Sequence, residues 1–349
     1  MGEWEEFMLD IYKDKKIFIT GASGFKGTWL TSMLLYLGAE VKGYSLVPNE
    51  VRNHFELLNN NFEHNFHDIK DLNALSHSIH SFNPDLIIHM AAQPLVRQSY
   101  IDPYGTFETN IIGSMNIFEA CDYVDSILGI INVTTDKVYL NLEKSTGYKE
   151  SDSLWGHDPY SASKVCSEQI TSCYRNIRDY IITSARAGNV LGGGDWSEDR
   201  IIPDIIRSTV RNKKVVIRNS NSVRPWQHVL DVLYGYLLIG ERILNKDPLM
   251  NSSFNFGPDN DNLASVLSIV NTSKTYWDKI DYITDINKDS FHETSILTLN
   301  SDKAKDILKW KPKYNVEKTI EKTITWYKEF YYNNNLITYD QIEDYFGEM

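Results

Sequence analysis

The stretch KIFITGASGFKGTWL, residues 16–30, decides the fold of this 349-residue chain. Residues 16–20 are mostly apolar and predict a strand, the apolar run from Phe25 predicts a helix, and a short glycine-rich turn joins them. Glycines at 21, 24 and 27 let the backbone approach a bound group, and the N-terminus of a helix favours a phosphate. The spacing differs from GxGxxG, but the physical logic is the same, so we predict that the pyrophosphate of a nicotinamide dinucleotide binds here.

Short apolar runs alternate with amphipathic stretches through the first half of the chain, which is typical of βα units and a parallel sheet. Strands are expected at residues 16–20, 40–44, 63–67, 86–90, 128–134 and 181–186, and helices at 25–37, 72–81, 104–121 and 159–174. Nearly all-apolar strands indicate a sheet covered on both faces. We therefore predict an α/β fold, a Rossmann-type doubly wound parallel sheet with a smaller mixed α/β lobe on its C-terminal side.

The alternating pattern breaks after residue 187, at the glycine-rich LGGGDW segment, and an apolar helix returns at residues 226–245. We expect residues 1–187, with a returning segment at about 226–250, to form the dinucleotide-binding domain. Residues 188–225 and 251–349 would then form the substrate-binding lobe.

Composition excludes several classes of protein. The net charge of −12 argues against a nucleic-acid binder, whose footprint would be basic. The three cysteines form no CxxC pair, which suits a reducing compartment and gives no sign of a metal site. The acidic N-terminus does not resemble a signal peptide, and no apolar run approaches the length of a membrane span. We expect a cytoplasmic protein with no metal, nucleic-acid or membrane partner.

The second expected strand is followed by Tyr44, Ser45 and Leu46, where a ribose-binding carboxylate would normally stand. No arginine lies beside them to bind a 2′-phosphate, so NAD is favoured over NADP. Asp68, after the third strand, is a candidate contact for the adenine, although a plain loop aspartate is nearly as good an interpretation.

The segment DPYSASK places Tyr160 and Lys164 one turn apart on one face of a helix. An ammonium there is expected to lower the tyrosine pKa, which would make a phenolate base available for a sugar hydroxyl. Tyr12 and Lys16 have the same spacing, so the motif alone is weak. Only Tyr160 follows the fifth strand, whose carboxyl end opens into the ligand crevice.

That strand ends in INVTTDKVY, with Thr134, Thr135, Asp136 and Lys137 at the mouth of the crevice. Asp136 and Lys137 could form an ordinary solvated ion pair. Taken together with the glycine turn and the Tyr160–Lys164 pair, a catalytic role is the better interpretation.

With these motifs the chain resembles an extended short-chain dehydrogenase/reductase, and within that superfamily the CDP-glucose 4,6-dehydratases. The resemblance spans residues 16 to about 330 and includes HMAAQPLVRQSY, ARAGNVLGGGDW, DRIIPDIIR, RPWQHVLDVLYGYL, FNFGP and LKWKP. Lys26, Lys137 and the GGGDW and RPWQHV runs are characteristic of this subfamily. The chain departs from it at Ala22-Ser23, where His-Thr is common, and between about residues 259 and 300.

The resemblance implies oxidation of the sugar C4 hydroxyl, elimination of water across C5 and C6, and return of the hydride to C6. Tyr160 would be the base at the C4 hydroxyl, Lys164 its electrostatic partner, and Thr135 a ligand of the C4 oxygen. Asp136 would protonate the departing 6-hydroxyl. Lys137 stands where related dTDP-glucose enzymes have the glutamate that takes the C5 proton, and it could do the same only as a neutral amine.

The resemblance also implies binding residues and an oligomer. The NAD site would comprise Gly21, Ser23, Gly24, Phe25, Lys26, Gly27, Ser45, Asp68, Ile69, Ala91, Ala92, Gln93, Tyr160 and Lys164. The nucleotide-sugar substrate would contact Arg97, Asn189, Arg218, Arg224 and Glu293, since guanidinium groups suit phosphate oxygens. The helices at 104–121 and 159–174 would pair across a two-fold axis as a four-helix bundle, giving a homodimer.

Three alternatives remain open on the sequence. A sugar-nucleotide 4-epimerase uses the same tyrosine, lysine and NAD, but usually has a small hydroxyl residue in place of Asp136. A dehydratase of another nucleotide sugar would have the same catalytic set, because no residue visibly selects cytidine. A protein that binds the dinucleotide without catalysis should show damage at Tyr160, Lys164 or Asp136, and none is visible.

Overall fold

The computed structural model describes residues 9–48, 52–144, 146–217, 220–258, 263–284 and 297–347. Its centre is a seven-stranded sheet with the order β11-β6-β5-β4-β1-β2-β3, in which every neighbouring pair is parallel. The strands are β1 (Lys16–Thr20), β2 (Glu40–Ser45), β3 (Glu63–Phe66), β4 (Leu86–His89), β5 (Gly129–Val133), β6 (Ile181–Ala187) and β11 (Ser253–Phe256). The predicted doubly wound parallel sheet is confirmed.

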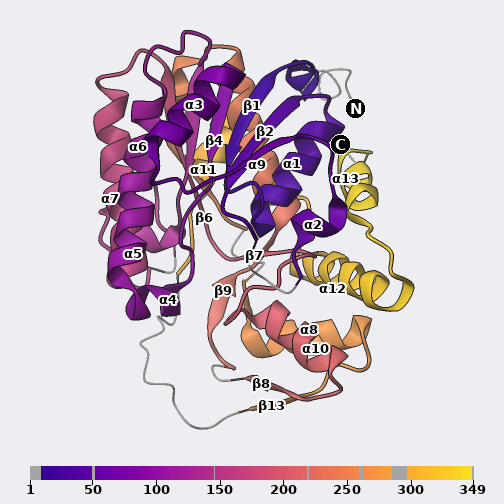
Figure 1. The fold of residues 1–349 in the computed structure, drawn as a ribbon. Helices are drawn as coiled ribbons and strands as arrows, with labels where there is room; N and C mark the ends of the chain where they lie inside the picture. Colours follow the sequence, from indigo (N-terminus) through magenta and orange to yellow (C-terminus); the bar gives the residue numbers. More distant parts are fainter. Residues whose placement is uncertain are drawn as a thin grey trace.

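Alternation along the strands divides the core between the two faces of the sheet. Ile17 and Ile19 of β1 point to one face and pack with α1 (Phe25–Tyr36) and α9 (Val229–Leu244). Phe18 points to the other face and packs with α3 (Leu72–Phe82) and α6 (Gly113–Ala120). Figure 1 shows α3, α6 and α7 (Pro159–Arg175) on one side of the strands. The sheet is therefore covered on both faces, as its apolar strands predicted, except at the edge strand β3, whose residues are partly or fully exposed.

Elements from the second half of the chain form a second, smaller body below the carboxyl ends of the strands (Figure 1). It contains α8 (Ile201–Val210), α10 (Val266–Tyr276) and α12 (Val316–Asn333), and the strand pairs β8–β13 (Val215–Ile217, Tyr282–Thr284) and β9–β12 (Val223–Pro225, Leu263–Ser265). The pairs β9–β12 and β8–β13 are antiparallel and parallel, respectively. The expected small mixed lobe is thus present, while the division into two domains stays a prediction.

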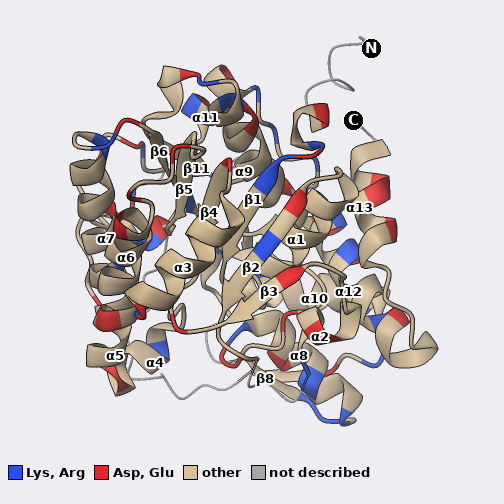
Figure 2. Ribbon diagram, turned by 45° about the horizontal axis from the view of Figure 1, so that its top comes forward, with Lys and Arg blue, Asp and Glu red and all other residues tan. Residues whose placement is uncertain are grey.

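Several short elements complete the chain. They are η1 (Leu9–Tyr12), α2 (His54–Leu58), α4 (Val96–Ile101), α5 (Pro103–Phe107), the π-helical turn η2 (Glu108–Ile112), η3 (Asp136–Val138), β7 (Val190–Leu191), β10 (Gln227–His228), η4 (Pro248–Met250), α11 (Asp302–Leu308) and α13 (Thr338–Gly347). Figure 2 shows that charged residues are distributed unevenly over the helices. Helix α3 carries no Lys, Arg, Asp or Glu, and the charged residues of α13 are all acidic.

Two expectations need correction. The single helix expected at residues 104–121 is divided into α5, η2 and α6, with the π-helical turn in the middle. The returning segment expected to end at about residue 250 continues through the edge strand β11, which pairs with β6, so residues 253–256 belong to the sheet and not to the lobe. Among the described residues, no helix combines the length and apolar character that a membrane span requires.

Candidate active site

The glycine turn after β1 is shaped by two close backbone contacts. Gly21 has a φ of +74°, and a Cβ atom there would lie 2.8 Å from the amide nitrogen of Ala91. A Cβ atom on Gly27 would lie 2.1 Å from the Gly21 carbonyl oxygen, so only glycine lets α1 pack onto the turn. Gly24 is exposed and has open space above it except for the Gly21 oxygen at 3.3 Å. The turn therefore leaves a bare backbone surface beside the start of α1.

The N-terminus of α1 suits an anion. Its N-cap, Gly24, offers no side-chain acceptor, and the first turn holds no acidic residue. The first amide groups of the helix are thus open to an external acceptor, which the helix dipole would favour if it were negatively charged. These features fit the pyrophosphate of a dinucleotide, as the sequence predicted.

The expected ribose side of the turn is a network of hydroxyl groups. Ser45 Oγ donates to Ser23 Oγ at 2.7 Å and lies 3.0 Å from His64 Nε2, while Ser23 Oγ donates to the Leu46 carbonyl. Burial lowers the pKa of His64 to about 4, so this histidine is neutral. Neutral hydroxyl and imidazole groups therefore occupy the place where dinucleotide-binding folds commonly have a ribose-binding carboxylate. These groups provide no cation that would bind the 2′-phosphate of NADP.

Two further groups of expected cofactor residues line the neighbouring strand ends. Asp68 accepts a hydrogen bond from the Lys70 amide and lies 3.6 Å from its ammonium, and the adjacent Ile69 is buried. Ala91, Ala92 and Gln93 follow β4 and border the glycine turn through the Gly21–Ala91 contact. The Gln93 amide already bonds within the protein, donating to Thr106 and accepting from Leu95.

The carboxyl end of β5 brings three expected catalytic residues together. Thr135 and Asp136 are buried, and the Thr135 hydroxyl donates to Asp136 Oδ1 at 3.0 Å. Thr135 also caps η3 by accepting from the Lys137 amide at 3.3 Å. This capped turn fixes the direction of both side chains relative to the sheet.

Tyr160, at the start of α7, points at this turn and is hydrogen-bonded to Thr135. Burial raises the pKa of Tyr160 to about 12, with Asp136 acting in the same direction and the Thr135 bond opposing. The expectation of a lowered tyrosine pKa is therefore wrong for the protein by itself. The physical reason is that a buried phenol loses more from desolvation than it gains from the cations nearby.

Lys164 lies one turn further along α7 and is also buried. Its ammonium donates to the Val133 carbonyl at 3.1 Å, which holds it beside the end of β5. Burial lowers the pKa of Lys164 to about 8, and the nearby Glu168 opposes this shift.

Lys26 reaches the same region from the first turn of α1. Its ammonium lies 3.4 Å from the Tyr236 hydroxyl of α9 and over the ring of that tyrosine. Burial, together with the charges of Lys164 and Arg200, lowers the pKa of Lys26 to about 7, against the charge of Asp136. Lys26 therefore faces catalytic residues as well as the glycine turn.

Lys137 differs from Lys26 in its surroundings. Its side chain is 36% exposed, and its ammonium lies 3.8 Å from Asp136 Oδ1. Burial and neighbouring cations, which favour the neutral form of an amine, are found at Lys26.

The expected substrate residues lie where the lobe meets the sheet. Asn189 follows β6, and its carbonyl accepts from the Gln227 amide of β10. Arg224 lies on β9, and Arg97 of α4 forms an ion pair with Asp199 at 3.1 Å. Arg218 and Glu293 lie outside the described residues.

Sequence reasoning missed residues that adjoin this centre. Arg200 pairs with Asp195 at 2.9 Å and acts on the pKa of both Lys26 and Tyr160. Glu168 and Arg186 form a buried pair behind Thr134. Arg200 falls in the DRIIPDIIR motif and Arg186 in the ARAGNV motif, so both could have been singled out.

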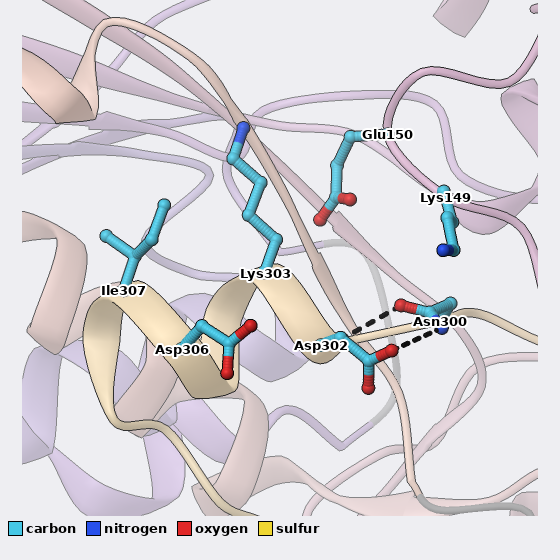
Figure 3. A pocket seen from close by; sticks show the side chains of 7 residues that line it. All are labelled: Lys149, Glu150, Asn300, Asp302, Lys303, Asp306 and Ile307. Carbon is cyan, nitrogen blue, oxygen red and sulfur yellow. Dashed lines mark hydrogen bonds between the residues drawn. The ribbon is translucent and has the colours of Figure 1, made fainter.

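A separate hollow of about 290 Å³ lies against α11 and is lined by Lys149, Glu150, Asn300, Asp302, Lys303, Asp306 and Ile307. Figure 3 shows Asn300 and Asp302 joined by hydrogen bonds at its rim. None of the expected site residues lines it, and carboxylates and ammonium groups are mixed in its wall. The hollow is therefore separate from the residues gathered at the strand ends.

The chain is similar in sequence to nucleotide-sugar dehydratases and to an epimerase. The family model described as GDP-mannose 4,6 dehydratase matches residues 18–323. The CDP-glucose 4,6-dehydratase of Salmonella typhimurium is 39% identical over 354 residues, covering 97% of this chain and 98% of the relative. The CDP-paratose 2-epimerase of Salmonella typhi is 25% identical and covers 89% of this chain and 98% of the relative.

Solved structures share the architecture. The epimerase Mth375 of Methanothermobacter thermautotrophicus has a TM-score of 0.82 at 20% identity, with 98% of each chain covered. The dTDP-glucose 4,6-dehydratase of Bacillus anthracis, solved in complex with NAD, has a TM-score of 0.75 at 22% identity, with 90% of this chain and 97% of the other covered. At these identities, the likeness establishes the fold.

Proposed function

The chain belongs to the GDP-mannose 4,6-dehydratase family, and from this premise we propose that it is an NAD-dependent CDP-glucose 4,6-dehydratase. The resemblance predicted from the sequence motifs is thereby confirmed. The reaction converts CDP-glucose to CDP-4-keto-6-deoxyglucose, a step in the synthesis of deoxysugars for surface polysaccharides. Support for this substrate comes from the relative of Salmonella typhimurium, which aligns along almost the whole chain.

One observation carries the proposal, namely that Thr135, Asp136 and Tyr160 converge at the end of β5. Tyr160 is bonded to Thr135, whose hydroxyl reaches Asp136. A tyrosine and a threonine suffice to handle the C4 hydroxyl, which both epimerases and dehydratases need. The buried carboxyl group beside them is the additional acid that elimination of water requires.

In the proposed mechanism, each residue transfers one proton or binds one substrate atom. Tyr160 takes the proton of the C4 hydroxyl while Thr135 binds the same oxygen. The resulting C4 ketone acidifies the C5 proton, so a base can remove it, and Asp136 protonates the 6-hydroxyl, which leaves as water. Two amines are candidates for the base that takes the C5 proton: Lys137, which adjoins Asp136, and the more buried Lys26. We assign the proton to Lys137 because the family pattern implies it, with Lys26 as the alternative. The glycine turn and Lys164 would hold NAD, which would supply a hydride acceptor for C4 and a hydride donor for C6. The base that removed the C5 proton would return it to C5 as the hydride reaches C6. Tyr160 would release its proton to solvent and Asp136 would regain one.

The glycine turn supports NAD as the cofactor. Gly21 and Gly27 leave no space for a Cβ atom, and the α1 N-terminus carries no competing side-chain acceptor. The pyrophosphate would bind at Gly24–Gly27, and Lys164 would hold the nicotinamide ribose. A cationic nicotinamide ring nearby would also favour the Tyr160 phenolate, which burial alone disfavours.

The test is incubation of the protein and NAD with CDP-, dTDP-, UDP- and GDP-glucose, followed by mass spectrometry and absorbance at 340 nm. We expect CDP-glucose to lose one water with no net NADH. Dehydration of another nucleotide sugar would reassign the substrate, and an unchanged mass with inverted C4 would indicate an epimerase. No conversion of any sugar would leave only dinucleotide binding. NADH accumulating in step with product would contradict the hydride return.

We also propose that the protein is a cytoplasmic homodimer. Cys121, Cys166 and Cys173 are all free thiols, as suits a reducing compartment. Apolar side chains exposed on α4–α6 offer a surface for a second copy of the chain, and they include Ile101, Tyr104, Ile112 and Met115.

A further inference from the structure

A buried ion pair lies behind the site and takes no part in the proposed proton transfers. Glu168 of α7 and Arg186 of β6 are both almost fully buried. Arg186 Nε donates to Glu168 Oε1 and Nη2 donates to Oε2, each at 2.9 Å, in a two-bond fork. Replacing such a pair by apolar residues is often neutral or stabilising in proteins, so stability alone is a weak reason for it.

The carboxylate of this pair connects two parts of the site. Glu168 Oε1 accepts a hydrogen bond from Thr134 Oγ1 at 2.5 Å, and Thr134 directly precedes Thr135 and Asp136. Glu168 also lies four residues after Lys164, on the same face of α7. The Lys164 ammonium donates to the carbonyl of Val133, the residue before Thr134.

Arg186 is itself held from the opposite side. Its Nη1 donates to the Tyr139 hydroxyl at 2.8 Å and to the Glu150 carbonyl at 3.3 Å, and the Tyr139 hydroxyl donates to Asn255 at 2.7 Å. These contacts tie the guanidinium to the loop after β5 and to β11. Glu168 is therefore presented to Thr134 and Lys164 by a rigid support.

We propose that Glu168, clamped by Arg186, is a positioning residue that fixes the turn at residues 134–136 and holds a buried carboxylate one helical turn from Lys164. The proposal rests on the proposed function, in which Thr135 and Asp136 act on the sugar and Lys164 on Tyr160 and the cofactor. Glu168 touches none of the reacting groups and acts only through its neighbours.

The charges around Lys164 determine the direction in which its pKa should change when Glu168 is replaced. Burial disfavours ionised Glu168, but the hydrogen bonds and charge of Arg186 and the bond from Thr134 hold the pKa of Glu168 below its usual value. Burial lowers the pKa of Lys164 to about 8, and the Glu168 charge limits that fall. Lys26 also faces Lys164, and so does His89, which burial keeps neutral with a pKa of about 3. Loss of the carboxylate removes the charge that opposes the effect of burial, so Lys164 would lose its proton at lower pH.

The test compares Glu168→Gln, Thr134→Val and the control Thr171→Val with wild type. Thr171 accepts from Asn132 at 2.7 Å, so the control removes a second buried polar contact between β5 and α7 that touches neither Lys164 nor Glu168. Titration of ¹³C-lysine-labelled protein by NMR, with Lys164 assigned from Lys164→Arg, follows the amine without any turnover. Steady-state kinetics from pH 6 to 10 supply kcat and KM.

We expect the Lys164 midpoint to fall by more than one pH unit in Glu168→Gln and to stay in place in Thr171→Val. Thr134→Val should lower kcat at least tenfold with KM changed less than threefold, while Thr171→Val stays within threefold of wild type in both. An unmoved midpoint in Glu168→Gln, or equal losses of kcat in the two threonine variants, overturns the proposal. A wild type inert towards every nucleotide sugar refutes the proposed function instead, since the NMR titration still reports on Lys164. If Glu168→Gln does not fold, the two threonine variants decide.

Discussion

Asp136 is the residue that separates the two halves of the proposed reaction. It is buried, accepts from Thr135 and lies beside Lys137. In the proposed reaction, the contacts to the C4 oxygen are assigned to Thr135 and Tyr160. Removal of its acidic proton should therefore block elimination without blocking oxidation at C4. Tyr160 is assigned to the earlier step, oxidation at C4, so its loss should block both oxidation and elimination.

For Asp136→Asn we predict that kcat for dehydration falls by about 10²–10⁴-fold, the usual contribution of a positioned acid. Because C4 oxidation still proceeds, bound NADH should appear at 340 nm on mixing with CDP-glucose and persist. Tyr160→Phe should show neither the absorbance nor the product. Stopped-flow absorbance with mass spectrometry of quenched samples measures both quantities. Rapid dehydration by Asp136→Asn would show that another group protonates the 6-hydroxyl.

At the scale of elements, the glycines of the turn are required by the packing of α1 as well as by the proposed ligand. Gly27 lies in the first turn of α1, and a Cβ atom there would fall 2.1 Å from the Gly21 oxygen and 2.8 Å from Ala22 Cα. Both neighbours are backbone atoms, so neither can move aside as a side chain would. Any larger residue must push α1 away from β1.

We predict that Gly27→Ala lowers the free energy of unfolding by about 1–3 kcal/mol, the typical cost of overpacking a well-packed site. NAD affinity should fall with it, because the helix N-terminus moves relative to the turn. Urea unfolding and calorimetric NAD titration measure the two effects. The matched control is Gly347→Ala at the end of α13, where an added Cβ meets nothing within 4 Å and stability should stay near wild type. A fully stable Gly27→Ala would show that α1 tolerates the displacement.

Sequence periodicity could predict the elements whose apolar pattern alone shows which face is buried in the core. The six expected strands and the helices at 25–37, 72–81 and 159–174 occur within a few residues of their predicted ends, because apolar runs fix both their type and their burial. The interruption of the helix at 104–121 has no such local signal. Its π-helical turn buries Asn110, which bonds to Gln93 and Ser163. Those partners come from other elements, so the interruption depends on tertiary contacts.

The strand β11 escaped prediction for a related reason. Its four residues, SFNF, are too short for alternation to be decisive, and they become a strand by pairing with the free edge of β6. Site residues at strand ends could be predicted, since parallel strands meet at one edge of a sheet. The raised pKa of Tyr160 could not, because it depends on how fully the phenol is buried.

On the scale of the whole molecule, the site is assembled from distant parts of the chain. β1 supplies the glycine turn, β5 and α7 the catalytic groups, and the segments after β6 the expected substrate contacts. The Arg97–Asp199 pair joins α4 to the segment before α8, so an expected substrate arginine also links the two bodies. Exposed apolar side chains of α4–α6, among them Ile101, Tyr104, Ile112 and Met115, form the surface on which the proposed dimer depends.

For that surface we predict that Tyr104→Glu converts a dimer to a monomer, measured by light scattering after size exclusion at micromolar concentration. Tyr104 is 77% exposed on α5, three residues after the exposed Ile101 of α4 and four residues before η2. A carboxylate buried there against a second copy would lose its hydration without a cation to compensate. Val216→Glu is the control, because Val216 is an exposed apolar residue on β8, in the lobe away from α5. A monomeric wild type would refute the proposed dimer. A Tyr104→Glu variant that stays dimeric would place the interface elsewhere, and dissociation of Val216→Glu would place it at β8.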